Sequence, residues 1–137
     1  MAARPRVLLK EQNFLQPDGE KAGLAGAYYT NVTFEGSPAF TRVDERVDFS
    51  WSGGSPRQGF PSANFSVRWT GRIKPRQDGT YVFYLYSDDG SRLYLDNKLL
   101  VDNWGDRPAQ LKEGTLTLKG GEAHDIRIDY YQKGGMR

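Results

Sequence analysis

Apolar and polar residues alternate over most of this chain. In Phe65-Ser-Val-Arg-Trp-Thr, the side chains of Phe65, Val67 and Trp69 fall on one face of an extended strand and their polar neighbours on the other. No stretch longer than about 11 residues repeats its apolar residues at the helical period of 3.6. Turn residues recur about every 8–12 positions, the spacing typical of sandwiches and barrels. We therefore predict an all-β fold, an antiparallel sandwich of two packed sheets with little or no helix.

The predicted strands are short. Residues 80–87 are β-branched and aromatic, which is typical of a strand buried on both faces. Asp96-Asn97 joins two alternating runs, residues 92–95 and 98–102, and predicts a hairpin because both residues tolerate a left-handed backbone. The other predicted strands span residues 24–29, 39–43, 47–51, 115–118 and 124–131.

The length of 137 residues argues for one domain. Residues 1–22 are predicted to be a lead-in, with an edge strand over residues 6–10, and residues 23–137 to be the module itself. Residues 52–64 are rich in glycine, proline and serine and carry Phe60, and a loop of that length is usually functional or mobile.

The composition excludes several classes of protein. The absence of cysteine rules out disulfide scaffolds, thiolate metal sites and cysteine nucleophiles. The single histidine, His124, leaves few routes to zinc or nucleophilic catalysis. A net charge of +2 with interspersed signs, and no apolar run near 18 residues, argue against nucleic acid and membranes as partners. We predict no catalysis by this chain alone.

The segment Ser87-Asp-Asp-Gly-Ser places two adjacent carboxylates at the end of the most apolar predicted strand. It is either a solvated Asp-Gly turn or a site for a hard cation, since Ca²⁺ takes six to eight oxygen ligands. Neighbouring residues of a plain strand point to opposite faces. A cis peptide bond between Asp88 and Asp89 would turn both carboxylates to one side.

Seven segments, in order and in spacing, resemble the PA-14 domain family, named for a segment of anthrax protective antigen. They cover most of the chain from about residue 23 to residue 135. The segments are Gly23-Leu-Ala-Gly-Ala-Tyr-Tyr, Val47-Asp-Phe-Ser-Trp, Phe65-Ser-Val-Arg-Trp-Thr-Gly, Asp78-Gly-Thr-Tyr-Val-Phe, Ser87-Asp-Asp-Gly-Ser-Arg-Leu-Tyr-Leu-Asp, Leu100-Val-Asp-Asn-Trp and Ile126-Arg-Ile-Asp-Tyr-Tyr-Gln-Lys-Gly-Gly.

This resemblance implies a β-sandwich whose calcium-dependent members bind glycans. In those members a cis peptide joins two aspartates, a second loop completes the metal shell, and the ion ligates vicinal hydroxyls of a sugar. Carried over to this sequence, the metal ligands are Asp88, Asp89, Gln132 and Gly134, and Asn103 is a further candidate. The residues predicted to contact the sugar are Asp88, Asp89, Gln132, Lys133, Gly135, Phe60 and Trp104.

We therefore expect a non-catalytic, calcium-dependent module that binds a mono- or oligosaccharide and belongs to a secreted, periplasmic or cell-surface protein. One alternative is a substrate-shaping insertion of a glycoside hydrolase of the β-glucosidase kind. Such an insertion would place Phe60 or Trp104 in a subsite of a neighbouring catalytic domain. A second alternative is a structural spacer or interaction domain.

In the family that this chain resembles, another strand follows the second loop. Only Met136 and Arg137 remain after that loop here, so we expect an excised module whose parent continues beyond Arg137. The missing strand predicts an exposed edge or gap beside residues 124–131. Residues 7–9 would fill that gap within one molecule or from a neighbour, and an edge-strand dimer would follow.

Overall fold

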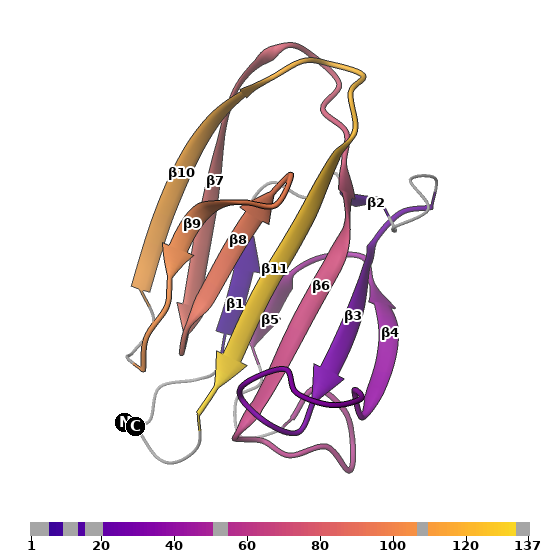
Figure 1. Cartoon of the computed structure of the whole chain (residues 1–137), viewed down its shortest axis with the longest axis vertical. Coiled ribbons are helices and arrows are strands. Elements are labelled where there is room, and N and C mark those ends of the chain that lie inside the picture. The colour runs from indigo at the N-terminus through magenta and orange to yellow at the C-terminus, as the bar shows by residue number, and fades with distance from the viewer. Residues whose placement is uncertain (1–5, 10–13, 16–20, 51–54, 107–109, 134–137) are drawn as a thin grey trace.

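The chain folds into a sandwich of two antiparallel β-sheets (Figure 1), which confirms the predicted fold class. The computed structural model describes residues 6–9, 14–15, 21–50, 55–106 and 110–133. No helix occurs among these residues. The Asp96-Asn97 hairpin is also confirmed, since both residues have the left-handed backbone that a two-residue turn requires, with φ of 50° and 64°.

Sheet A has four strands. Their order is β10 (Gln110–Leu118), β7 (Gly79–Asp88), β1 (Arg6–Leu9) and β5 (Asp48–Ser50). Strand β1 pairs with β7 on one side and with β5 on the other, so Leu8 lies opposite both Tyr86 and Asp48. The predicted edge strand is therefore an interior strand, and it connects two segments that are far apart in the sequence.

Sheet B lies in front of sheet A in Figure 1. Its order is β4 (Phe40–Asp44), β3 (Leu24–Tyr29), β6 (Phe65–Ile73), β11 (His124–Gln132), β8 (Ser91–Leu95) and β9 (Lys98–Asn103), with β2 (Phe14–Leu15) also paired to β6. Strand β11 is paired on both sides, and Ile128 lies opposite Trp69 on one strand and Leu93 on the other.

The predicted gap beside residues 124–131 is thus wrong. Strand β8 occupies one side of β11 and β6 the other, and residues 7–9 pair in sheet A instead. Alternation within β11 could not reveal its partners, because pairing is decided by segments distant in the chain. Because β11 is paired on both sides, it offers no free edge at this position for the predicted edge-strand dimer.

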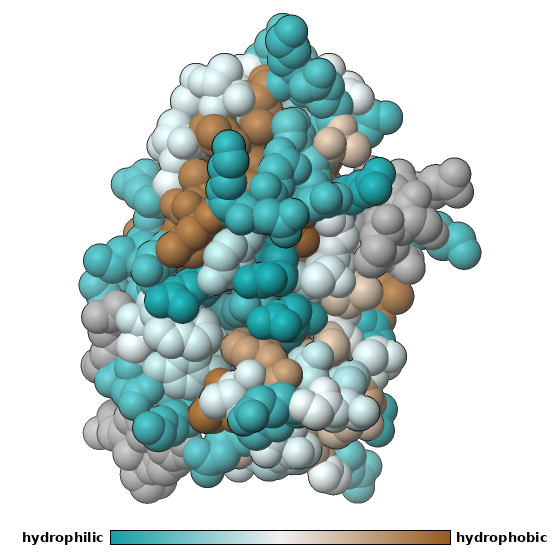
Figure 2. Space-filling view, in the orientation of Figure 1, coloured by the Kyte–Doolittle hydropathy of each residue, from teal (hydrophilic) through white to brown (hydrophobic). Residues whose placement is uncertain are grey.

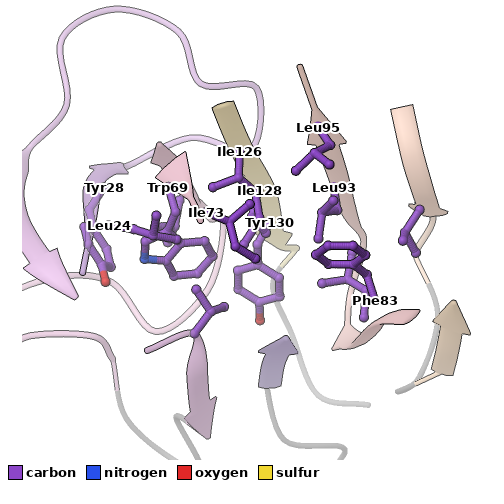
Figure 3. Packing of buried hydrophobic residues seen from close by; sticks show 14 of the residues in the cluster. Leu24, Tyr28, Trp69, Ile73, Phe83, Leu93, Leu95, Ile126, Ile128 and Tyr130 are labelled. Carbon is purple, nitrogen blue, oxygen red and sulfur yellow. The ribbon is translucent and has the colours of Figure 1, made fainter. Parts of the chain in front are cut away.

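The inward side chains of the two sheets form one apolar core (Figure 3). The indole of Trp69 on β6 is fully buried and stacks on Phe49 of β5, with ring centroids 5.9 Å apart, so the core joins the sheets. The other core residues labelled in Figure 3 are Leu24, Tyr28, Ile73, Phe83, Leu93, Leu95, Ile126, Ile128 and Tyr130.

Strand β7 is buried on its inner face only, which corrects the prediction of burial on both faces. Phe83 and Leu85 point into the core and are fully buried, whereas Tyr84 and Tyr86 are half-buried on the outer face. Aromatic residues have a strong preference for strands in general, so their presence does not distinguish a covered face from a partly covered one.

Candidate functional site

The ends of β7 and β11 meet at one end of the sandwich. The N–H of Lys133, which follows β11, donates to Asp89 Oδ2 at 2.9 Å, and the N–H of Tyr131 donates to the carbonyl oxygen of Gly90 at 3.0 Å. Ser91 at the start of β8 pairs with Tyr130 on β11 and with Asn103 at the end of β9. Three chain segments are therefore brought to the Asp88-Asp89 turn.

Both carboxylates of this turn are buried. Asp88 is 0% exposed and Asp89 is 1% exposed, and the peptide bond between them is cis, as predicted. The hydroxyl of Tyr130 donates to the carbonyl oxygen of Asp88 at 2.7 Å. Burial raises the pKa of Tyr130, and the nearby charges of Asp88 and Asp89 raise it further. The solvated-turn interpretation is therefore wrong, since the two acids lie inside the protein.

Buried polar side chains support the backbone of this turn. The hydroxyl of Ser87 donates to the carbonyl oxygen of Asp89 at 2.9 Å and lies 2.5 Å from the hydroxyl of Ser91. The Nδ2 of Asn103 donates to the carbonyl oxygens of Leu85 at 3.3 Å and Gln110 at 2.8 Å. Asn103 therefore ties β9 of sheet B to β7 and β10 of sheet A, and its sequence context gave no signal of that role.

Gln132 adds an amide to the two carboxylates. Its side chain is 4% exposed and its Nε2 donates to the carbonyl oxygen of Lys133 at 3.2 Å. Its Oε1 is buried, and none of the residues that the structure describes donates a hydrogen bond to it. A buried acceptor that receives no hydrogen bond costs free energy of folding. This oxygen is therefore suited to coordinate a cation or to accept a hydrogen bond from a ligand.

The donor set fits a hard cation. Within the described ranges, no three His, Cys, Asp or Glu side chains are grouped so that they could hold a metal ion by themselves. Two carboxylates and an amide oxygen remain, all of them oxygen donors of the kind that Ca²⁺ accepts together with backbone carbonyls and water. Zinc would instead favour nitrogen and sulfur ligands. The predicted ligand Gly134 and the predicted sugar contact Gly135 lie outside the described residues.

A model of the PA14 domain matches residues 20–137. This chain belongs to the PA14 domain family. The anti-sigma-I factor RsgI3 of Acetivibrio thermocellus is 41% identical over 115 residues, which are 84% of this chain and 18% of that protein. A β-glucosidase of Kluyveromyces marxianus is 30% identical over 131 residues, 82% of this chain and 15% of that protein.

Solved structures are similar to this chain as well. An anti-sigma factor domain-containing protein superposes with a TM-score of 0.79 at 40% identity, over 84% of this chain and 40% of that one. The K. marxianus β-glucosidase in complex with glucose gives a TM-score of 0.68 at 25% identity, over 87% of this chain and 16% of that one. This PA14 domain spans less than a fifth of the length of the two curated relatives.

Trp104 lies next to the turn of this PA14 domain. It is half-buried, its ring is 4.7 Å from the ring of Tyr131, and the Arg92 guanidinium lies 4.7 Å from its centroid on the ring face. The hydroxyl of Tyr131 donates to Asp106, and the Asp106 carboxylate also lies 3.3 Å from Lys133 Nζ. Trp104 and Lys133 thus belong to the rim of the site, and their contact with a sugar stays a prediction.

Phe60 is buried against the core, and its contact with a sugar stays a prediction. It is 9% exposed and packs edge-on against Phe40 at 5.3 Å and Phe65 at 5.5 Å between ring centroids. The loop that carries it is held by the Arg42 guanidinium, which donates to the carbonyl oxygen of Pro56 at 3.1 Å. An aromatic residue in a long polar loop looks exposed in the sequence, but this loop folds back onto the core.

The described part of the PA14 domain offers no helix with the length and hydrophobicity needed to cross a membrane.

Proposed function

We propose that this PA14 domain is a non-catalytic, calcium-dependent carbohydrate-binding module. The observation that carries the proposal is the buried pair Asp88 and Asp89, with Asp89 bonded to Lys133, and the buried Oε1 of the preceding Gln132, which receives no hydrogen bond from the described residues. Two acids inside a protein are stable when a cation compensates their charge. The similarity to a β-glucosidase, a protein named for action on a sugar, supports a carbohydrate as the ligand.

Each residue has a distinct part in this proposal. Asp88 and Asp89 neutralise the ion, Gln132 adds a neutral oxygen, and Gly134 supplies a backbone carbonyl. The ion, when bound, offers coordination positions to vicinal hydroxyls of a sugar. Lys133 and Gly135 are proposed to donate hydrogen bonds to those hydroxyls, and Trp104 to cover one face of the sugar. The Lys133 N–H bond to Asp89 keeps Lys133 against the turn.

The proposed ligand is a mono- or oligosaccharide. The proposed location is that of a secreted, periplasmic or cell-surface protein, where the module would encounter glycans. A neighbouring domain of a longer protein would carry any catalysis or signalling. A single ion with two hydroxyls buries little surface, so we expect Kd values of about 0.1–10 mM for a monosaccharide. Tight binding would then require several copies of the module acting together.

Isothermal titration of the purified chain with glucose, galactose, mannose and fucose tests the proposal. Binding with 5 mM calcium that disappears with chelator and in the Asp88→Asn and Asp89→Asn variants is the expected result. Glu113→Gln, a charge-neutralising change at an exposed position on β10, is the matched control and should bind as wild type does. Sugar binding that survives chelator would overturn the calcium requirement and favour the substrate-shaping insertion. In that case Trp104 would be the aromatic residue that lines a subsite of the neighbouring catalytic domain.

A second measurement concerns the absence of catalysis. The purified chain should not hydrolyse aryl glycosides, because no nucleophile and base, and no pair of carboxylates across a cleft, stands out in its sequence. Turnover by wild type that survives in Asp88→Ala would reveal a catalytic pair elsewhere. If none of the sugars binds in the calorimetric titration, with or without calcium, the structural spacer is favoured.

A further inference from the structure

The outer face of sheet B carries a second group of polar side chains, away from the Asp88-Asp89 turn. Figure 2 shows hydrophilic residues across the middle of this face. Arg127 on β11 lies opposite Thr70 on β6 and Tyr94 on β8, and Arg72 lies opposite Asp125. Side chains that share one face of paired strands are direct neighbours.

These side chains line a hollow of about 250 Å³. Its polar walls are Thr70, Arg72, Tyr94, Asn97, Asp125 and Arg127, and we call it the outer hollow. It lies at the end of β8 where Leu95 pairs with Ile126, whereas the Asp88-Asp89 turn lies at the other end, where Ser91 pairs with Tyr130. The two sites are therefore separated by the length of one strand.

The ion pairs on this face leave Arg127 with the weakest partner. Asp129 accepts two hydrogen bonds from Arg68, at 2.8 and 3.1 Å, which is the bidentate geometry of a strong pair. Arg127 Nη2 lies 3.5 Å from the same carboxylate. Arg72 pairs with Asp125 at 3.3 Å. One carboxylate is thus shared by two guanidinium groups, and the positive charge is in excess at Arg127.

Arg127 is held in place before any ligand arrives. Its guanidinium stacks on Tyr94, with Cζ 4.1 Å from the ring centroid, and its side chain is 38% exposed. Its Nε is buried and is not offered to a ligand. The rest of this ordered, partly exposed guanidinium has only the long Asp129 pair among the ion pairs of the described residues, so it is suited to a planar anion such as a carboxylate.

The remaining walls suit hydroxyl groups. The Asp125 carboxylate is 65% exposed and can accept hydrogen bonds, and the Asn97 amide can both donate and accept. Asn97 is presented at the tip of the hairpin by its left-handed backbone. A hollow of this volume is smaller than a typical drug-sized pocket of about 300–1,000 Å³ and matches a single sugar ring.

We propose that the outer hollow binds the uronate residue of an acidic polysaccharide, independently of any metal. The sugar carboxylate pairs with Arg127, and its hydroxyls bond to Asp125, Asn97 and Thr70. An acidic peptide side chain would satisfy Arg127 but would bring no hydroxyl donors for Asp125. A neutral sugar would leave the charge of Arg127 uncompensated. This proposal does not depend on the calcium site, so either site can be disproved without affecting the other.

NMR titration of the wild-type chain with galacturonate, in chelator, tests it. We expect the amide resonances of Arg127 and Asn97 to shift with a millimolar Kd that weakens as salt is added. Galactose, which has the same ring without the carboxylate, should bind at least tenfold more weakly. N-acetylglutamate tests the peptide alternative and should also bind at least tenfold more weakly.

Two variants locate the binding. Arg127→Gln should weaken galacturonate binding at least tenfold, and Arg76→Gln, at an exposed arginine of the β6–β7 turn, should not change it. Asn97→Gly keeps the left-handed turn while removing the amide, and should weaken binding about threefold. If Arg127→Gln does not fold, Asn97→Gly still tests whether galacturonate binds in the outer hollow.

Four results would overturn the proposal. They are equal binding of galactose and galacturonate, loss of galacturonate binding in chelator, unchanged binding in Arg127→Gln and Asn97→Gly, and binding of N-acetylglutamate as tight as that of galacturonate.

Discussion

The carboxylate of Asp89 and the backbone of Lys133 are joined by a hydrogen bond of 2.9 Å, so the turn after β7 is attached to the end of β11. One carboxylate oxygen is thereby oriented by the protein itself. Preorganised ligands favour metal binding, because less conformational entropy is lost when the ion arrives. Lys133, the last described residue at the start of the loop that would complete the metal shell, is thus bonded to Asp89.

Calcium is expected to stabilise the folded chain. A ligand that binds only the native state adds RT ln(1 + [L]/Kd), about 2.7 kcal/mol at a hundredfold excess over Kd. For a domain of this size that corresponds to a rise in melting temperature of about 5–10 °C. Melting curves with 5 mM calcium and with chelator measure the rise, and Asp89→Asn should abolish it. Identical curves for wild type would contradict the proposed site.

Gly90→Ala is expected to damage the same site through packing. A Cβ at this position would lie 2.3 Å from the Tyr131 ring and 2.8 Å from the backbone nitrogen of Gly105. Backbone cannot move aside easily, so we expect a loss of about 2–4 kcal/mol of stability and of the calcium-induced rise in melting temperature. Gly79→Ala is the matched control, since its Cβ would meet only Tyr81 at 3.8 Å. Equal stability of the two variants would show that the Gly90 turn can relax.

Asp44 should be among the costliest side chains to remove. It is 7% exposed and accepts hydrogen bonds from the Tyr28 hydroxyl at 2.5 Å, Trp69 Nε1 at 2.8 Å and Arg42 Nε at 2.7 Å. Asp44→Ala leaves all three donors without this acceptor, and we expect a loss of about 3–5 kcal/mol in urea unfolding.

The control for that experiment is Asp125→Ala. Its carboxylate is 65% exposed and forms a surface pair with Arg72, so its removal should cost no more than about 1 kcal/mol. A loss in Asp44→Ala as small as that in the control would mean that water replaces the lost acceptor.

Local patterns predicted the strands and the acids of the candidate site. Alternation located residues 24–29 and 124–131 nearly to the residue, and the Asp96-Asn97 turn followed from its backbone requirements. Strand geometry showed only that a cis bond between Asp88 and Asp89 would turn both carboxylates to one side. The resemblance to the PA-14 family implied that bond, and the structure has it. All of these properties depend on residues close together in the chain.

Properties that depend on distant segments were not predictable in this way. Strand β1 became interior because β5 and β7 both pair with it, and no pattern within residues 6–9 encodes those partners. Phe60 is buried because its loop folds over Phe40 and Phe65. The sequence suggested Asn103 as a further candidate metal ligand, yet its amide nitrogen donates hydrogen bonds that connect the two sheets.

The last prediction concerns alkaline pH and Tyr28. Burial raises the pKa of this hydroxyl, and the charge of Asp44 and its hydrogen bond to Tyr28 raise it further, against a smaller lowering by Arg42. Below the ordinary tyrosine pKa near 10, both folded and unfolded chains keep the proton and the stability does not depend on Tyr28 ionisation. Above that pH the unfolded chain loses its proton first, so the free energy of unfolding falls by about 1.4 kcal/mol per pH unit from this group. Tyr28→Phe should be less stable at pH 8, because Asp44 loses a donor, but its disadvantage should shrink steadily from pH 10 to 12. Urea unfolding of the two chains across that range measures the difference, and parallel stability curves would show that Tyr28 ionises as readily in the folded state as in the unfolded one.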